Sequence, residues 1–286
     1  MMTQSLLQEL QELQELQELQ EPQELRPLRV LQLTDPHLSA DRDARLLGIN
    51  TRDSLAAVID DVLKHGGQPD LVLATGDLAQ DGSVDAYEAL AQGLARFDCD
   101  SLWIPGNHDN TERLWPVARR YRAERKHLKQ GGWQILMLDS SVPRKVHGEL
   151  TRQELEWLDA TLTANPRLPA LIALHHHPVD ITAHWMADIG LHNRNAFWEI
   201  IHRHPQVRVV TWGHIHQEVD RQENGVRLLG TPSTCIQFTA GAREFSVEER
   251  APGYRWFELG SAGVFTTKVH RALEFKVVLD RESGGY

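Results

Sequence analysis

Five short polar segments constrain the fold of this chain more than any other feature. They are Asp35-Pro-His37, Gly76-Asp77, Gly106-Asn-His-Asp109, His175-His-His177 and Gly213-His-Ile-His216. Four of them directly follow a run of apolar, β-branched-rich residues, and each such run predicts a buried strand. In an α/β fold, polar groups that serve a ligand lie at the carboxyl ends of the strands. The pattern therefore predicts an α/β fold in which Asp, Asn and His side chains gather at strand ends.

Strands and helices alternate through the first two thirds of the sequence. We expect strands near 28–34, 70–75, 101–105, 135–139, 168–174 and 207–212, and helices near 51–64, 84–97, 152–164 and 195–204. Thr151 with Glu154 three residues later predicts a capping box at the start of the third helix. Beyond residue 213, strand-like segments at 226–229, 254–259, 264–270 and 275–278 follow one another without helices. This change predicts a second sheet of hairpins, packed on the first.

The residue types and their spacing indicate a site for two metal ions. Asp35 and His37 are two residues apart, so in an extended chain their side chains leave the same face, and His214 and His216 repeat this spacing. Asp77 follows a glycine and offers a carboxylate able to bridge two cations, which a hydrolytic two-metal site needs. Taken singly, each His fits a structural or surface role and Asp77 fits a helix cap. Their joint occurrence favours the metal site.

The third and fourth segments add further candidate ligands. Asn107 offers a neutral carbonyl oxygen, and His175 lies directly at a strand end. His108 is better suited to catalysis or to phosphate contact, with Asp109 orienting its ring by a hydrogen bond. The alternative for this segment is an ordinary tight turn. For His176 and His177 two roles stay open. Their side chains either contact the ligands or the substrate, or are polar side chains with a purely structural role.

Composition narrows the class of protein. The 286 residues carry a formal net charge of −10, which argues against nucleic acid or an anionic membrane as the main partner. Cys99 and Cys235 are the two cysteines; they form no disulfide framework and fit a reducing compartment as buried thiols. No apolar run approaches the ~20 residues that span a bilayer, and no secretory signal is recognisable. We therefore expect a cytoplasmic protein.

The N-terminal part differs from the rest of the chain. Residues 7–25 repeat Leu-Gln-Glu almost without change. A strict period of three drifts around a 3.6-residue helix and forms no single apolar stripe. We expect residues 1–27 to be a low-complexity extension, disordered or a fraying helix, outside a folded domain at 28–286. An oligomerisation helix is the alternative.

The five polar segments, in this order, resemble the signature of the calcineurin-like metallophosphoesterase superfamily. Further segments are similar to its bacterial class III 3′,5′-cyclic AMP phosphodiesterases: Leu47-Gly-Ile-Asn50, Ala74-Thr-Gly-Asp-Leu-Ala-Gln-Asp81, His147-Gly-Glu-Leu150, Gly213-His-Ile-His-Gln-Glu218 and Thr231-Pro-Ser-Thr-Cys-Ile-Gln-Phe238. The resemblance covers residues 28–286. It implies a four-layer αββα sandwich, in which two mixed sheets are flanked by helices. Pro36 departs from the pattern, since Ser or Thr is more usual there, but it removes no ligand.

The resemblance also implies a ligand set and catalytic residues. Two ions, Fe²⁺/Fe³⁺, Mn²⁺ or another divalent ion, would be bound. The first would be held by Asp35, His37, Asp77 and His216, and the second by Asp77, Asn107, His175 and His214. His108 and Asp77 would be the catalytic residues, and these eight positions together would bind substrate.

The implied activity is hydrolysis of 3′,5′-cyclic AMP to 5′-AMP by two-metal-activated hydroxide attack on phosphorus, which lowers intracellular cyclic AMP. Phe238 either stacks on the adenine or anchors a strand turn. We expect a monomer or homodimer that acts on this small molecule. Three alternatives stay open: a related dinuclear-metal phosphodiesterase for other phosphodiesters or nucleotides, a non-catalytic scaffold of the same fold, and an assembly protein that uses the Leu-Gln-Glu repeat.

Overall fold

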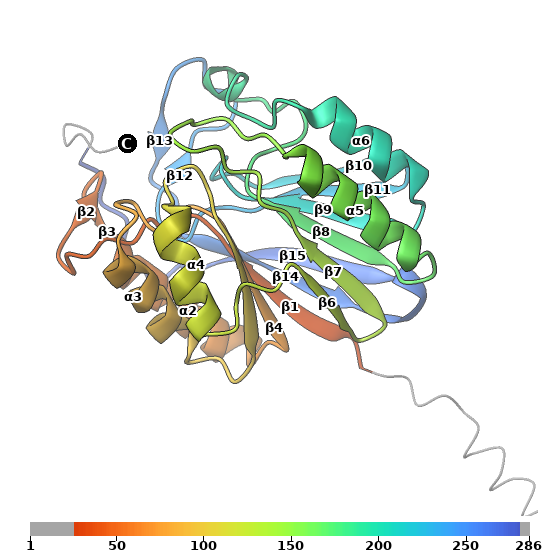
Figure 1. Ribbon diagram of the computed structural model, residues 1–286. Coiled ribbons are helices and arrows are strands. Elements are labelled where there is room, and N and C mark those ends of the chain that lie inside the picture. The colour runs from red at the N-terminus through yellow and green to blue at the C-terminus, as the bar shows by residue number, and fades with distance from the viewer. Residues whose placement is uncertain (1–25, 281–286) are drawn as a thin grey trace, which may run out of the picture.

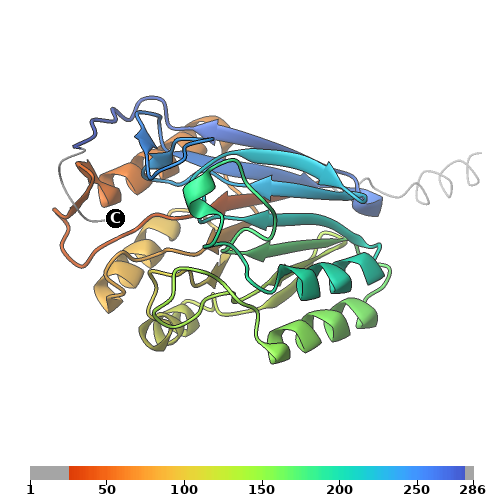
Figure 2. The ribbon, with the colours of Figure 1, turned by 90° about the horizontal axis from the view of Figure 1, so that it is seen from above.

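Two β-sheets packed face to face between two layers of helices form the body of the protein. The computed structural model describes residues 26–280, so the Leu-Gln-Glu repeat lies outside the described residues. Figures 1 and 2 show helices α2, α3 and α4 over one outer face, and α5 and α6 over the other. The four-layer αββα sandwich expected from the resemblance is confirmed.

The first sheet has five strands. Their order is β15 (Phe265–Arg271), β14 (Gly253–Leu259), β1 (Leu28–Leu33), β4 (Leu71–Thr75) and β5 (Asp100–Ile104). Strands β1, β4 and β5 are parallel, whereas β14 and β15 extend the sheet as an antiparallel hairpin beside β1. The covering helices are α2 (Thr51–Asp61), α3 (Val84–Leu94) and α4 (Thr111–Arg120). A short π-helical turn, Val62–Gly66, continues α2.

The second sheet has six strands. Their order is β10 (Val219–Glu223), β11 (Val226–Gly230), β9 (Val207–Trp212), β8 (Ala170–Leu174), β7 (Trp133–Met137) and β6 (His127–Gln130). The four central strands are parallel, and β10 and β6 are antiparallel edges. Helices α5 (Arg152–Ala164) and α6 (Arg194–Arg203) cover it. The smaller elements are β2 (Arg45–Leu46), β3 (Ile49–Asn50), β12 (Gln237–Phe238), β13 (Val247–Glu248) and the 3₁₀ turns His184–Met186 and Ser261–Gly263.

Alternating residues of the central strands bury both faces of each sheet. Val30 and Leu73 point into the layer between the sheets, where they meet side chains such as Ile135. Their neighbour Leu31 points the other way, toward the helices of the first sheet. Strands buried on both faces read as continuous apolar runs in the sequence, which is why these segments could be recognised as strands.

The expected division into a first sheet and a later sheet of hairpins is wrong. The strand that ends before His175 and the one that ends before Gly213 belong to the second sheet, whereas the last two strands, β14 and β15, join the first sheet. The local sequence does not record which sheet accepts a strand, because the partner of β14 is β1, at the other end of the described chain. The partition depends on long-range hydrogen bonding between strands.

Three local expectations also need correction. Helix α4 was not predicted, and it contains Pro116 in its interior. The segment 275–278 is not a strand, because it packs alternate side chains such as Phe275 on the core without a neighbouring strand. Thr151 does cap α5 by accepting from the Glu154 amide, but the Glu154 carboxylate accepts from the Asp139 amide and pairs with Lys126 instead.

Candidate metal centre

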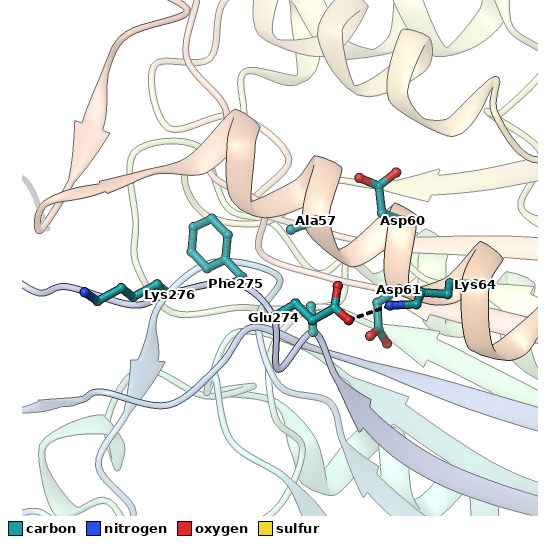
Figure 3. A pocket seen from close by; sticks show the side chains of 8 residues that line it. Ala57, Asp60, Asp61, Lys64, Glu274, Phe275 and Lys276 are labelled. Atoms are coloured by element: carbon teal, nitrogen blue, oxygen red, sulfur yellow. Dashed lines mark hydrogen bonds and ion pairs between the residues drawn. The ribbon is translucent and has the colours of Figure 1, made fainter.

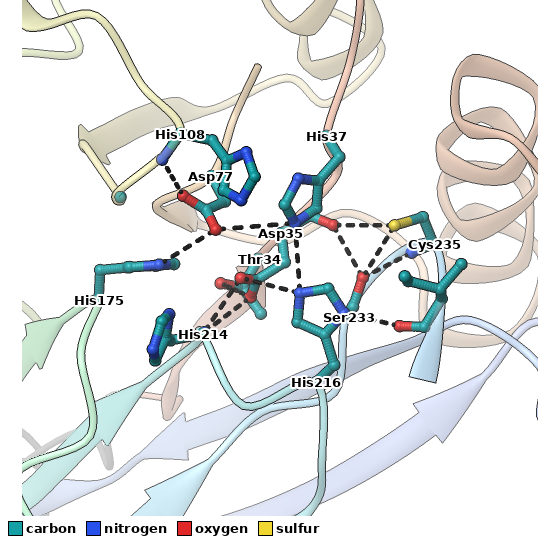
Figure 4. Close-up of polar contacts among 12 residues, drawn as sticks. Thr34, Asp35, His37, Asp77, His108, His175, His214, His216, Ser233 and Cys235 are labelled. Atoms are coloured by element: carbon teal, nitrogen blue, oxygen red, sulfur yellow. Dashed lines mark hydrogen bonds and ion pairs between the residues drawn. The ribbon is translucent and has the colours of Figure 1, made fainter. Parts of the chain in front are cut away.

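The predicted ligands lie together at one end of the sandwich, and both sheets contribute to them. Asp35 and His37 follow β1, Asp77 follows β4, and Asn107 and His108 follow β5. From the second sheet, the site receives the residues after β8 and β9, namely His175, His214 and His216. Figure 4 shows the Asp and His side chains among them converging from the two sheets. The carboxyl ends of parallel strands are where ligands bind in α/β folds.

Much of the site is built on strained backbone. Ten non-glycine residues of the described part have a positive φ, and five of them are predicted ligands: Asp35, His37, Asp77, His214 and His216, with φ between 46° and 65°. Each such conformation costs about 1–3 kcal/mol and persists only where the surrounding structure enforces it. Strain of this kind concentrates at functional sites, where the position of a side chain matters more than local stability.

In the first group of ligands, the rings of His37 and His216 face each other through their Nε2 atoms. His37 donates from Nδ1 to the amide oxygen of Gln80 at 2.6 Å, and His216 donates from Nδ1 to the Ile236 carbonyl at 2.9 Å. The two Nε2 atoms lie 3.2 Å apart, and each would carry a lone pair when the ring proton is on Nδ1. Asp35 Oδ1 lies 3.3 Å from His216 Nε2. A cation beside these atoms removes the repulsion among them.

The second group is centred on Asp77. Its Oδ2 lies 3.7 Å from His37 Nε2 and 3.4 Å from His175 Nε2, so it faces both groups. Asn107 Oδ1 is 3.3 Å from the same ring nitrogen of His175, whose Nδ1 donates to the Thr75 carbonyl. His214 contributes a buried ring whose two nitrogens have no hydrogen-bond partner among residues 26–280. Asp77 Oδ2 is likewise buried without a hydrogen bond there.

These residues fit metal ions by their chemistry. Among the described residues, four groups of side chains hold possible ligand atoms within 4.8 Å of one another and share members: Asp35/His37/His216, Asp35/Asp77/His175, His37/Asp77/His108 and His175/His176/His214. Buried polar atoms without partners cost free energy, which bound cations would recover. The chain therefore has His/Asp groups able to bind metal.

Burial and neighbouring charges set the protonation of the metal-free site. Burial alone would raise the pKa of Asp77, but the imidazoles of His175 and His108 hold it well below its usual value. Burial opposes the charge on His175 too, yet Asp77 raises its pKa to about 9. Burial lowers the pKa of His37 to about 3 and that of His214 well below its usual value. At neutral pH the metal-free site thus holds a His175–Asp77 ion pair beside the neutral imidazoles of His37 and His214.

Two glycines allow the ligand loops to approach one another. Gly106 lies so close to Asp77 that a Cβ atom at this position would be 2.2 Å from Oδ1 and 2.4 Å from the Asp77 amide nitrogen. At Gly76, where φ is 96°, a Cβ atom would lie 2.3 Å from His175 Nδ1. No side chain fits at either place, so the glycines of the Gly-Asp and Gly-Asn-His-Asp segments serve close packing of the site.

Asp109 has a different use from the one expected. Its carboxylate accepts from the backbone amides of Leu78 and Gly106 at Oδ2 and of Ala79 at Oδ1, at 2.8–3.0 Å. The expected role of orienting His108 is thus replaced by a link between the loop after β4 and the loop after β5. His108 in turn donates its own amide to Asp77 Oδ1 at 2.9 Å. This carboxylate fixes the distance between two ligand-bearing loops.

The histidine run divides into different roles. His176 uses both ring nitrogens, Nδ1 toward the Ser140 hydroxyl at 2.8 Å and Nε2 toward the Val146 carbonyl at 3.1 Å. It thereby anchors the segment 140–148 beside the centre. His177 is buried, and its Nδ1 has no hydrogen-bond partner within the described chain. Of the three, His175 has the position of a ligand.

Phe238 packs against the proposed ligand His216 and is too deeply buried to contact the substrate. Its ring lies parallel to that of His216, with centroids 4.1 Å apart and 4° between the planes, and the side chain is only 1% exposed. The alternative in which this ring stacks on adenine is therefore wrong for this structure. Sequence reasoning also missed Gln80 and Ile236, which orient the rings of His37 and His216. No local sequence signal marks such contacts, because they join residues far apart in the chain.

A separate cavity of about 220 Å³ lies between α2 and the segment after β15 (Figure 3). Asp61, Lys64, Glu274 and Phe275 are among its lining residues, and a Lys64–Glu274 ion pair crosses it. None of the predicted site residues lines it. Within residues 26–280, no helix has both the length and the apolar character that a membrane crossing requires.

Comparison with known proteins finds one matching family and several bacterial relatives. Residues 28–218 match the family model described as calcineurin-like phosphoesterase. The chain is 41% identical over 260 residues to the 3′,5′-cyclic adenosine monophosphate phosphodiesterase CpdA of Escherichia coli K12, covering 90% of this chain and 94% of the relative. It is 38% identical to the CpdA protein of Pseudomonas aeruginosa, with the same coverage. A 3′,5′-cyclic-nucleotide phosphodiesterase of Nostoc is 39% identical, covering 85% of this chain and 91% of that protein.

Solved structures agree on the fold. A dimetal phosphatase from Danio rerio superposes with a TM-score of 0.60 at 15% identity, covering 84% of this chain and 98% of that one. A purple acid phosphatase from yellow lupin superposes with a TM-score of 0.59 at 13% identity, covering 88% of this chain and 52% of that one. At such low identity these likenesses show the architecture alone. Together with the family match and the bacterial relatives, they show that the chain belongs to the calcineurin-like phosphoesterase family.

Proposed function

We propose that this protein hydrolyses 3′,5′-cyclic AMP to 5′-AMP at a centre that holds two metal ions. The observation that carries the proposal is a set of buried ligand atoms without hydrogen-bond partners among residues 26–280, namely Asp77 Oδ2 and both ring nitrogens of His214, with Asp77 Oδ2 facing His37 and His175. Bound cations would satisfy these atoms. The substrate is inferred from the relatives that cover nearly the whole chain and are named as cyclic AMP phosphodiesterases.

The proposed ligands divide between two ions. One ion would be held by Asp35, His37, Asp77 and His216, and the other by Asp77, Asn107, His175 and His214. When bound, the two cations supply Lewis acidity to the phosphoryl oxygens and make a water molecule nucleophilic near neutral pH. Nitrogen and oxygen ligands of these types suit iron, manganese and several other divalent ions, and we propose Fe²⁺/Fe³⁺ or Mn²⁺.

The chain's own residues position the reactants. His108 lies at the edge of the centre, with its ring 4.9 Å from that of His37 and its amide on Asp77. From this position its imidazole is placed to donate a proton to the departing 3′ oxygen, or a hydrogen bond to the phosphoryl group. General acid assistance of this kind contributes about 10²–10⁴ in rate. Asp77 holds both halves of the centre in register.

The remaining proposals concern the whole protein. We propose a cytoplasmic enzyme, a monomer or homodimer, that lowers intracellular cyclic AMP. We propose further that residues 28–286 form the phosphoesterase domain and that residues 1–27 are an extension outside it. Removing residues 1–25 and measuring the mass in solution tests the extension: an unchanged number of chains per particle and unchanged turnover are expected.

The first test is hydrolysis of cyclic AMP by the purified chain loaded with Mn²⁺ or Fe²⁺, followed by chromatography. Metal-dependent release of 5′-AMP is expected, with none from Asp77→Ala, which should also lose bound metal. A linear diester, bis-p-nitrophenyl phosphate, runs in parallel. Cleavage of that diester without any turnover of cyclic AMP would reject the proposed substrate and assign the chain to another branch of phosphodiesterases.

The role of His108 is tested separately. His108→Ala should retain both metals, because seven other side chains supply the ligands, while kcat for cyclic AMP falls by about 10²-fold or more. Metal content by elemental analysis and kcat are measured on the same preparation. Unchanged turnover would remove His108 from the mechanism.

A further inference from the structure

Aromatic side chains gather beside one edge of the metal centre. Phe238 stacks on the ring of His216 and is itself contacted edge-on by Trp185, with centroids 5.1 Å apart. Trp185 also meets Phe245 edge-on at 5.3 Å, and Phe245 meets Phe238 at 5.6 Å. The three rings thus form one cluster that begins at a proposed metal ligand and leads outward.

The outer members of this cluster are accessible. Phe238 is buried, but Trp185 is only partly buried and Phe245 is 44% exposed. The two outer rings lie on different segments, the 3₁₀ turn His184–Met186 and the hairpin of β12 and β13. A backbone hydrogen bond from the His184 amide to the Ala242 carbonyl, 2.9 Å long, ties the segments together. The exposed ring is therefore held in place from two sides.

Stability alone does not explain the choice of residues. The indole Nε1 of Trp185 is buried and has no hydrogen-bond partner within residues 26–280. A buried donor without an acceptor is unfavourable, and phenylalanine would avoid the cost. An exposed phenylalanine likewise contributes less to a core than a buried one. The planes of the two rings lie 79° apart, so a planar, apolar part of the substrate can stack on the face of one ring and meet the edge of the other.

We infer that Trp185 and Phe245 form an aromatic platform on which the base of a cyclic nucleotide stacks while its phosphate occupies the metal centre. The inference rests on the proposed function and names the residues that recognise the base. The separation between the platform and the metal centre suits a nucleotide. One ribose separates the base from the phosphorus in the nucleotide, and the ring of Phe238 separates the platform from His216 in the protein. Every nucleotide base has a π-face, so any of the bases can stack on an aromatic side chain.

The test compares substrates with and without a base. Cyclic AMP and the 3′,5′-cyclic phosphate of 1-deoxyribose carry the same phosphodiester, but only the first can stack. With the Mn²⁺-loaded full chain, Phe245→Ala should raise KM for cyclic AMP about 10-fold, the usual worth of one stacking contact, and leave kcat almost unchanged. The kcat/KM for the base-free substrate should not change.

The chain offers a matched control. Phe265 is also partly exposed and packs edge-on against a tryptophan, Trp133, with centroids 6.0 Å apart. It lies at the opposite end of the sandwich, at the start of β15 and opposite Leu259. Phe265→Ala should leave both substrates unaffected. Trp185→Leu should act like Phe245→Ala, and Mn²⁺ affinity measured by calorimetry shows whether the centre is intact in each variant.

Two results would overturn the platform alone: an unchanged KM for cyclic AMP in Phe245→Ala, or equal losses with and without a base. An unsubstituted chain with no metal-dependent turnover of cyclic AMP would overturn the proposed function, and the platform with it. Because Phe245 is on the surface, its replacement leaves the core intact, so the comparison stays decisive even if Trp185→Leu does not fold.

Discussion

Metal loading should release one proton from His175 at neutral pH, in addition to any proton that metal-bound water gives up. In the metal-free chain, His175 Nε2 lies 3.4 Å from Asp77 Oδ2, and both groups are fully buried. Burial disfavours the imidazolium, but Asp77 raises the pKa of His175 to about 9. A metal ligand must be a neutral imidazole, so a cation displaces this proton. The pKa values of His37 and His214 are lowered by burial, so neither adds a proton.

The magnitude follows from the shift. Below pH 9 the apparent affinity should rise about tenfold for each pH unit, and it should level off above pH 9. The stability of the metal-free chain has the opposite dependence. A pKa raised from 6.5 to about 9 corresponds to about 3 kcal/mol of stability. This contribution is full below pH 6.5 and is lost as the pH rises through 9.

Calorimetry of Mn²⁺ binding in two buffers of different ionisation enthalpy gives the proton count directly. About one proton per chain is expected from His175 at pH 7.5, besides any released by metal-bound water. His175→Gln should lower the count by about one for whatever metal still binds, whereas His147→Ala, a substitution outside the ligand set, should leave it unchanged. Zero protons from the unsubstituted chain, or the same count from His175→Gln, would refute the reasoning.

Three further predictions concern the support of the centre. Gly106→Ala should lower Mn²⁺ affinity by 10-fold or more, since the new Cβ atom would lie 2.2 Å from Asp77 Oδ1; calorimetry measures the loss, and wild-type affinity would show that the loop can yield. Asp109→Ala removes the acceptor of three backbone amides, which costs about 3 kcal/mol at roughly 1 kcal/mol for each amide left unsatisfied. Urea unfolding of the metal-free protein tests this, and a loss below about 0.5 kcal/mol would contradict it. Thr151→Ala removes the cap of α5 and should cost about 1 kcal/mol in the same assay with unchanged kcat and KM; altered kinetics would mean that α5 affects the site.

Local signals in the sequence located most of the ligand candidates. An apolar run followed by Asp, Asn or His marks a strand end, and the structure places Asp35, Asp77 and His175 at such ends. Burial of both strand faces makes these runs conspicuous. The boundaries of β9 and the cap at Thr151 were likewise readable, because each depends on neighbours in sequence.

Contacts between residues far apart in the chain could not be predicted from the sequence. The Asp109 carboxylate was expected to serve the neighbouring His108, but it serves the amides of Leu78 and Ala79, about 30 positions away. Phe238 was a candidate for base stacking, but its ring is buried on His216. Either role would have fitted the residue type. Only the path of the backbone decides which groups a side chain reaches.

The sequence by itself determined the strand–helix alternation, the residue types at the strand ends and, through its motifs, membership of a phosphoesterase family. Those features depend on periodicity and on local polarity. The tertiary structure alone decided that β8 and β9 join the second sheet, that two glycines let the ligand loops touch, and that the rings of His37 and His216 face each other. These outcomes arise from hydrogen bonds and packing between segments far apart in the chain, which no local pattern records.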